Sequence, residues 1–286
     1  MFYRVPLRLQ EKPLQRQMSF LAQARIAMHK LPPEGDVALE TSYHDPQLPK
    51  YASFSALYYI NQCAVTYDMA RRLKKTATML SVGSGASHME RFLVQGLKVP
   101  KENIFVSDIP LVERARNFFG SNSVEFSMNG EWPDFRHKFD YIIFPQSFEI
   151  GTGQLHNKGS WTNDLFFDKE SPIGALLYKI VASKLWNVGA DVDDSEMKEF
   201  LHLMEDMSII TGKLHVISEA MIRLKNRGKI IIVGSSFTWE ELAYVVMKLE
   251  ENLGTVGLEF IIPSDTQSSR YVNRTVAYNP LTFIKA

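Results

Sequence analysis

Residues Met79-Leu-Ser-Val-Gly-Ser-Gly-Ala-Ser-His88 form an apolar strand that runs into a Gly-x-Gly turn, and a helix is predicted directly after it. Two glycines close together at a strand end let the backbone approach a ligand, because neither carries a Cβ atom. The following helix points its free N–H groups and the positive end of its dipole into the same space. This stretch therefore predicts a ligand site at the carboxyl end of the strand.

Strands and helices alternate from Thr76 to the end of the chain. Apolar runs predict seven strands, at 77–82, 103–107, 123–128, 139–144, 229–234, 258–262 and 275–284. Helical spacing predicts helices at 87–97, 110–119, 197–226 (with a break near Thr211-Gly212) and 238–252. No helix separates the last two strands, so they should pair antiparallel. The pattern predicts an α/β fold with a Rossmann-like, doubly wound, mostly parallel seven-stranded sheet and an antiparallel terminal strand.

Two segments lie outside this alternation. Residues 1–52 are expected to form an N-terminal extension, helical over 8–29 and then rich in proline. Residues 145–195 are expected to form a cap inserted after the fourth strand of a main domain at 53–286. Ligands of open α/β sheets bind outside the carboxyl ends of the strands, so the insertion is placed to act as a lid. A purely structural cap is the alternative.

Composition narrows the classes of protein to consider. The chain has 286 residues with 32 basic and 32 acidic side chains, so no global field attracts nucleic acid or an anionic membrane. Its one cysteine, Cys63, excludes an intramolecular disulfide, and its histidines lack metal-ligand spacing, so no metal is expected. No apolar run is long enough to span a membrane, and the N-terminus lacks a signal-peptide pattern, so a cytoplasmic location is expected.

The glycine turn can be compared with two phosphate-binding motifs. A dinucleotide fingerprint requires Gly-x-Gly-x-x-Gly, and His88 occupies the third glycine position. A P-loop is excluded, because no Gly-Lys-Ser/Thr follows. An NAD(P)-dependent oxidoreductase therefore remains an alternative with an incomplete motif.

The turn also resembles the first motif of the class I S-adenosylmethionine-dependent methyltransferases. Residues 80–87 (Leu-Ser-Val-Gly-Ser-Gly-Ala-Ser) have its strand and Gly-x-Gly. The family often has an acidic residue where Ser81 stands and a third glycine where Ser87 stands. Residues 103–108 (Asn-Ile-Phe-Val-Ser-Asp) resemble the second motif, whose terminal acid holds the ribose hydroxyls.

Later segments resemble further parts of the same family. Residues 128–130 (Met-Asn-Gly) fall at the third motif, and 139–144 resemble the strand of the fourth. Residues 220–233 resemble the helix, turn and strand that carry a glycine before the fifth strand. The terminal antiparallel pair fits as well, so the resemblance extends over residues 53–286 without the insertion.

The resemblance implies S-adenosylmethionine as the cofactor. Asp108 would hold the ribose. Its separation from the glycine turn is close to the roughly 20 residues expected of a ribose-binding acid. A helix N-cap is the alternative for Asp108, because Pro110 follows. Asn129 would contact adenine, or it is a turn residue before Gly130. The full set of predicted cofactor-binding residues is Ser81, Gly83, Ser84, Gly85, Asp108, Ile109, Asn129, Phe144, Pro145 and Gln146.

Catalytic residues are harder to predict. Methyl transfer is an in-line displacement, for which proximity and orientation supply much of the acceleration. A general base is needed only where the nucleophile loses a proton. Glu149 and His156, in the insertion after the fourth strand, are the candidates. A loop histidine exposed to solvent is the alternative for His156.

The expected activity is methyl transfer to a small-molecule acceptor, because the cap encloses a site and the net charge is zero. Basic clusters at 71–75 and 223–229 would support a nucleic-acid or protein acceptor, although solvated helix ends also explain them. A catalytically silent binding or scaffold module with the same fold is the alternative from another class.

Overall fold

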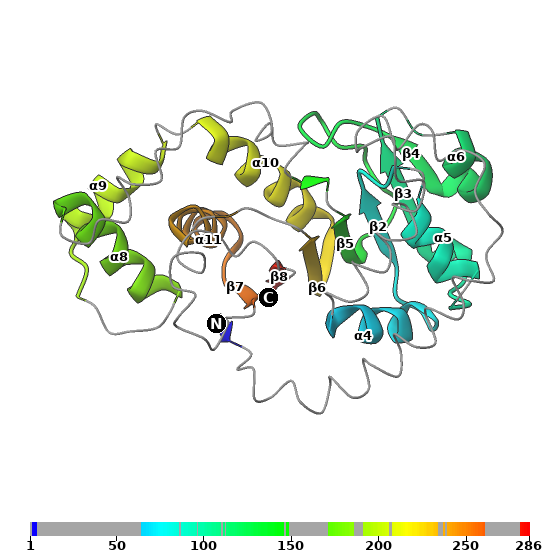
Figure 1. Ribbon diagram of the computed structural model, residues 1–286, viewed down its shortest axis with the longest axis horizontal. Helices are drawn as coiled ribbons and strands as arrows, with labels where there is room; N and C mark the ends of the chain where they lie inside the picture. The colour runs from blue at the N-terminus through cyan, green and yellow to red at the C-terminus, as the bar shows by residue number, and fades with distance from the viewer. Residues whose placement is uncertain are drawn as a thin grey trace, which may run out of the picture.

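The computed structural model describes residues 2–4, 64–148 except 86, 96, 110, 112 and 146, 171–185, 191–205, 208–260 except 234–236 and 238, and 281–286. Its centre is an eight-stranded sheet, with the strand order β1-β7-β8-β6-β5-β2-β3-β4, flanked by helices (Figure 1). The strands are β1 (Phe2–Arg4), β2 (Met79–Val82), β3 (Ile104–Asp108), β4 (Ser123–Glu125), β5 (Phe139–Pro145), β6 (Leu224–Val233), β7 (Val256–Phe260) and β8 (Leu281–Lys285). The α-helices are α4 (Ala64–Leu73), α5 (His88–Gln95), α6 (Glu113–Phe119), α8 (Pro172–Leu185), α9 (Asp194–Glu205), α10 (Ser208–Arg223) and α11 (Trp239–Leu253).

The sheet is parallel except for β8, which runs antiparallel to both of its neighbours, β6 and β7. This confirms the Rossmann-like α/β fold, the seven expected strands and the antiparallel terminal strand. Two features were not expected. An eighth strand, β1, pairs in parallel with β7 and comes from the segment predicted as a helical extension. In addition, β8 inserts between β6 and β7 and does not extend the edge.

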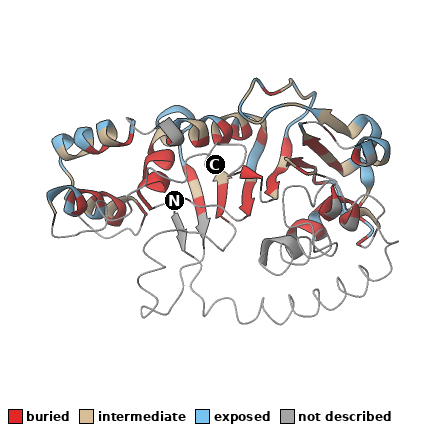
Figure 2. Ribbon diagram, turned by 45° about the horizontal axis from the view of Figure 1, so that its top comes forward, coloured by how far each residue is buried: buried red, intermediate tan, exposed pale blue. Residues whose placement is uncertain are grey.

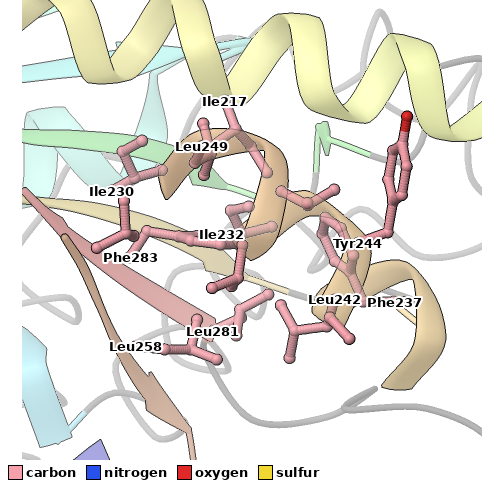
Figure 3. Packing of buried hydrophobic residues seen from close by; sticks show 14 of the residues in the cluster. Ile217, Ile230, Ile232, Phe237, Leu242, Tyr244, Leu249, Leu258, Leu281 and Phe283 are labelled. Atoms are coloured by element: carbon pink, nitrogen blue, oxygen red, sulfur yellow. The ribbon is translucent and has the colours of Figure 1, made fainter. Parts of the chain in front are cut away.

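Side chains of the central strands alternate between two hydrophobic cores. In β5, Ile142 and Phe144 face the core shared with α8, α10 and α11. Tyr141 and Ile143 face the core shared with α4, α5 and α6. Burial on both faces explains why these strands read as continuous apolar runs in the sequence. Figure 2 shows the buried strands, and Figure 3 shows the first core where α10 and α11 cover β6, β7 and β8.

The break in the long predicted helix was placed wrongly. One helix, α9, ends at Glu205 and the next, α10, begins at Ser208, while Thr211 and Gly212 lie inside α10. A glycine in a helix interior costs about 1 kcal/mol relative to alanine. Burial of Val216 and Ile217 against the sheet offsets that cost.

Within residues 145–195, the structure describes one complete helix, α8. Helix α8 packs against α9 and α11. Helices α8 and α9 lie on the far side of α11 from β2, β3 and β4 (Figure 1). The rest of the insertion and the predicted helix at 8–29 lie outside the described residues. In the part of the chain that the structure describes, no helix has the length and apolar character needed to cross a membrane.

The order of strands creates a switch point at β2. The chain moves from β2 to β3 and β4 on one side, and then returns to β5 on the other side of β2. Ligands of open α/β sheets bind in the crevice that such a reversal leaves outside the carboxyl ends of the strands. The Gly-x-Gly turn and the ends of β3 and β5 meet at this point.

Candidate functional site

The turn after β2 has a left-handed backbone at three positions. The φ angles are 70° at Gly83, 55° at Gly85 and 58° at Ser87. Ser87 stands where the resemblance places a third glycine, so the backbone keeps the glycine conformation although the side chain is present. The left-handed region costs a non-glycine residue about 1–2 kcal/mol. Two contacts to Ser84 offset this cost: Ser87 N–H donates to its carbonyl at 2.8 Å, and the two hydroxyl oxygens lie 3.0 Å apart.

The N–H groups of this turn are used inside the protein. Gly83 and Ser84 both donate to the Ser107 carbonyl, at 2.8 and 2.9 Å. Gly85 N–H donates to the Asp108 carboxylate at 2.5 Å. A pyrophosphate binds such turns through free N–H groups. Among residues 83–85 and 87, each N–H already has a protein acceptor, so the turn is poorly suited to phosphate.

Asp108 lies at the carboxyl end of β3, directly beside the turn. One carboxylate oxygen accepts the Gly85 N–H, and the other accepts the Ile109 N–H at 2.7 Å. The helix N-cap alternative is wrong, because α6 begins only at Glu113. These two bonds fix the orientation of the carboxylate beside the turn. The neighbouring Ile109 side chain is 54% exposed and offers an apolar surface beside the carboxylate.

A second carboxylate supports the turn from below. Ser81 is fully buried and its hydroxyl donates to Glu90, whose side chain is also buried. Glu90 lies in the first turn of α5, where the helix dipole favours negative charge. Its carboxylate therefore lies beside Ser81, the strand position at which the methyltransferase family often has an acid. Sequence reasoning missed Glu90; an acid in the first turn of the helix after the glycines was the available signal.

Ser147 is another residue that sequence reasoning missed. Its hydroxyl donates to the Val82 carbonyl at 2.6 Å, which joins the ends of β5 and β2. A Cβ atom on Gly83 would lie 2.3 Å from the Ser147 Cβ and 3.3 Å from the Met128 Cε. The space left by the absent Cβ of Gly83 is thus filled by protein atoms. A polar residue just beyond an apolar strand was the only signal for Ser147.

The turn that contains Asn129 lies close to the glycine turn, because Met128 reaches Gly83. Gly130 N–H donates to the Ser127 carbonyl at 3.1 Å, and Asn129 is exposed between them. Trp132 holds the turn by an indole N–H bond of 2.8 Å to the Met128 carbonyl. Both interpretations of Asn129, a turn residue and an adenine contact, are compatible with this position.

The cofactor-binding and catalytic residues predicted near the end of β5 differ in where the structure places them. Phe144 is fully buried and packs edge-on against Phe148, which stacks on Phe237. Its ring therefore belongs to the core, and Pro145 ends the strand beside the turn. Gln146, Glu149 and His156 lie outside the described residues. Within the described ranges, no group of three or more His, Cys, Asp and Glu side chains is arranged to hold a metal ion.

Comparison with protein-family models found no match, and comparison with curated proteins found no relative. Solved structures with a similar backbone include the SAM-bound amino pentose methyltransferase CalS10 from Micromonospora echinaspora, at a TM-score of 0.38 and 10% identity, covering 87% of this chain and 96% of that one. They also include the plantazolicin methyltransferase BpumL in complex with SAH, at a TM-score of 0.36 and 10% identity. That match covers 96% of this chain and 99% of the other. A third, a putative O-methyltransferase from Nostoc punctiforme, matches at a TM-score of 0.34 and 9% identity. That match covers 96% of this chain and 69% of the other.

The strand order, with a single antiparallel strand, is that of a Rossmann-like α/β fold. Because the identities and TM-scores are low, the residues of the site carry the functional proposal below.

Proposed function

We propose that this protein is a methyltransferase that uses S-adenosylmethionine. One observation carries the proposal: the Asp108 carboxylate lies beside the glycine turn, and the N–H groups of residues 83–85 and 87 are already bonded. The cofactor is a sulfonium cation with an adenosine and an amino-acid tail, and it has no phosphate. A site with two nearby carboxylates and few free N–H donors favours such a cation over a dinucleotide.

Each residue has a proposed role in binding. Asp108 accepts hydrogen bonds from the ribose hydroxyls, and Ile109 covers the adenine ring. The left-handed backbone at Gly83 and Gly85 brings the main chain close to the amino-acid tail. Glu90, through Ser81, contributes negative charge beneath the turn. Asn129 and the backbone at Pro145 border the adenine and the methyl path, respectively.

Bound at this point, the cofactor would supply an electrophilic methyl group. The protein's part is to hold that methyl group in line with an acceptor and to exclude water. Glu149 and His156 remain the proposed bases for an acceptor that must lose a proton. We favour a small-molecule acceptor, because the net charge of the chain is zero and the insertion follows the end of β5, one of the strands at the switch point. The dehydrogenase alternative is disfavoured, because the N–H groups of residues 83–85 and 87 already have protein acceptors and are not available to a pyrophosphate.

Calorimetric titration with S-adenosylhomocysteine tests the binding role of Asp108. Asp108→Asn removes the charge from the hydrogen bonds to ribose, each worth about 1.5–3 kcal/mol. The affinity should fall roughly ten- to a hundredfold, since 1.4 kcal/mol is a factor of ten. Glu199→Gln, which removes an exposed acid on α9, is the matched control and should leave the affinity unchanged. Equal affinities in the two variants would refute the ribose role.

The activity itself is tested by isotopic transfer. The protein is incubated with methyl-labelled S-adenosylmethionine and a fractionated small-molecule extract, and products are detected by mass spectrometry. The proposal predicts a labelled small molecule and release of S-adenosylhomocysteine. Cofactor binding without transfer to this extract, or to peptide and RNA fractions tested alongside it, would favour the silent-module alternative.

A further inference from the structure

The amino ends of four adjacent parallel strands form a basic surface opposite the candidate cofactor site. The basic edge consists of residues 71–75, 98–101 and 136–138, which precede β2, β3 and β5, and residues 225–227, which lie at the start of β6. These four segments contain ten Lys and Arg residues and no Asp or Glu. All ten of these side chains are exposed. The sequence alone showed two basic clusters, at helix ends far apart in the chain.

Contacts between the strands bring the four segments together. Asn103, just after 98–101, donates to the Leu73 carbonyl at 2.7 Å. The Arg72 guanidinium lies 5.7 Å from the centre of the Tyr141 ring on β5. Asp140, also on β5, accepts Thr78 N–H at 2.8 Å and the Lys225 ammonium at 2.7 Å. The basic edge is therefore one continuous surface.

The four segments carry ten cations, and three acids lie within two residues of them along the chain. Asp140 pairs with Lys225, and the other acids nearest in sequence are the exposed Glu102 and Asp134. Burial and the charge of Lys225 lower the pKa of His137, and burial and the charge of Lys138 lower the pKa of Lys285. Both shifts have the sign that a local positive field produces. The zero net charge of the chain thus conceals a polarised distribution.

The shape and chemistry of the basic edge fit a nucleic-acid backbone. The strand order β6-β5-β2-β3 spans three intervals of about 4.8 Å, or about 14 Å, which matches about four nucleotides of a strand at 3.4 Å each. The described large apolar side chains that are more than a third exposed are Ile109, Ile173, Tyr178, Ile222 and Leu253, and none lies in these segments. The surface therefore offers cations for phosphates and little that would select apolar side chains of a peptide.

We infer that the basic edge binds the phosphate backbone of single-stranded nucleic acid, without sequence selectivity. This binding is independent of the cofactor site, which lies at the opposite ends of the same strands. A nucleic acid held there would recruit the protein to a location and would not present a base to the candidate methyl path.

Fluorescence anisotropy with a labelled 20-nucleotide RNA of mixed sequence tests this inference. Titrations of the full chain at 50, 100 and 200 mM salt should give a log K that falls linearly with log salt. Contact with four phosphates predicts a slope of about −3, since each contributes about −0.7 on a single strand. Lys75→Glu combined with Lys138→Glu should make the slope shallower by about 0.7 for each lost contact. The matched control, Lys184→Glu with Lys198→Glu on α8 and α9, should bind like the unmodified protein.

Three results would overturn the inference. The first is no RNA binding at 50 mM salt. The second is equal binding by the two double variants, when circular dichroism shows both folded. The third is binding of poly-glutamate, or salt-sensitive self-association, that RNA does not displace, because the partner would then be an acidic protein or a second copy. Affinity for S-adenosylhomocysteine should be the same in all variants, so failure here is distinguishable from failure of the proposed methyltransferase.

Discussion

At Gly83, any side chain would clash with atoms of Ser147. Gly83→Ala places a Cβ 2.3 Å from the Ser147 Cβ, at a φ of 70° that alanine adopts only with strain. Overpacking of this kind typically costs about 1–3 kcal/mol, and the left-handed backbone adds about 1–2. We expect a clear fall in the melting temperature and weaker binding of S-adenosylhomocysteine.

A second substitution separates these two causes. Ser147→Gly in the Gly83→Ala background removes the atoms that clash but leaves the strained φ. Stability should then recover in part, as measured by urea denaturation. If Ser147→Gly brings no recovery, the contact between the two residues is not what requires a glycine at position 83.

Ser87 offers a test in the opposite direction. Ser87→Gly relieves the strained φ of 58° but loses the hydroxyl contact with Ser84, so the free energy of unfolding should change by less than about 1 kcal/mol. Ser87→Ala loses the same contact and keeps the strain, so it should be the less stable of the two. Chemical denaturation of both variants measures the difference. A Ser87→Ala protein as stable as Ser87→Gly would contradict the conformational explanation.

At the scale of elements, Asp140 joins three strands at their amino ends. Burial opposes ionisation of its carboxyl, but hydrogen bonds from Lys225 and Thr78 outweigh that effect and lower its pKa. A lowered folded pKa means that Asp140 stabilises the fold above the pKa of the unfolded chain. That contribution is lost as the pH falls through the folded pKa.

The predicted consequence is a stability difference that depends on pH. Asp140→Asn should melt at a lower temperature than the unmodified protein at pH 7, and the gap should close as the pH falls below 3.8, the ordinary value for this carboxyl. Asp134→Asn, an exposed acid nearby, is the control and should show no gap at either pH. A gap that is constant with pH would mean that Asp140 acts through shape and not through charge.

A buried ion pair joins α10 to α11. The Lys213 ammonium lies 2.7 Å from the Glu241 carboxylate and 4.5 Å from the centre of the Phe237 ring, and neither charged side chain is exposed. Lys213→Met leaves a buried charge without this partner and should cost about 3–5 kcal/mol in denaturant unfolding. Lys213→Met with Glu241→Leu should recover most of that loss, because two apolar side chains of similar size replace the pair. A double variant as unstable as the single one would contradict this account.

Sequence patterns predicted elements well where neighbours along the chain determine them. The apolar runs of β5 and β6 were predicted as strands, because both faces of these strands are buried. The insertion of β8 between β6 and β7 depends on pairing between distant segments, which local periodicity does not encode. Ser147 was missed for the same reason, since it bonds Val82 on a strand 65 residues away. Glu90 is only nine residues from Ser81, so its signal was local and was overlooked. Asp108 was found because its position at the end of a strand is a local feature.

For the whole molecule, the site and the basic edge lie at opposite ends of one set of parallel strands. We propose that the glycine turn, bordered by Asp108 and Glu90, selects a cationic cofactor and rejects a pyrophosphate. Calorimetric titration of the unmodified protein with S-adenosylmethionine and, separately, with NADH tests it most directly. We predict saturable binding of S-adenosylmethionine and no heat with NADH. Binding of NADH, or of neither compound, would contradict the claim.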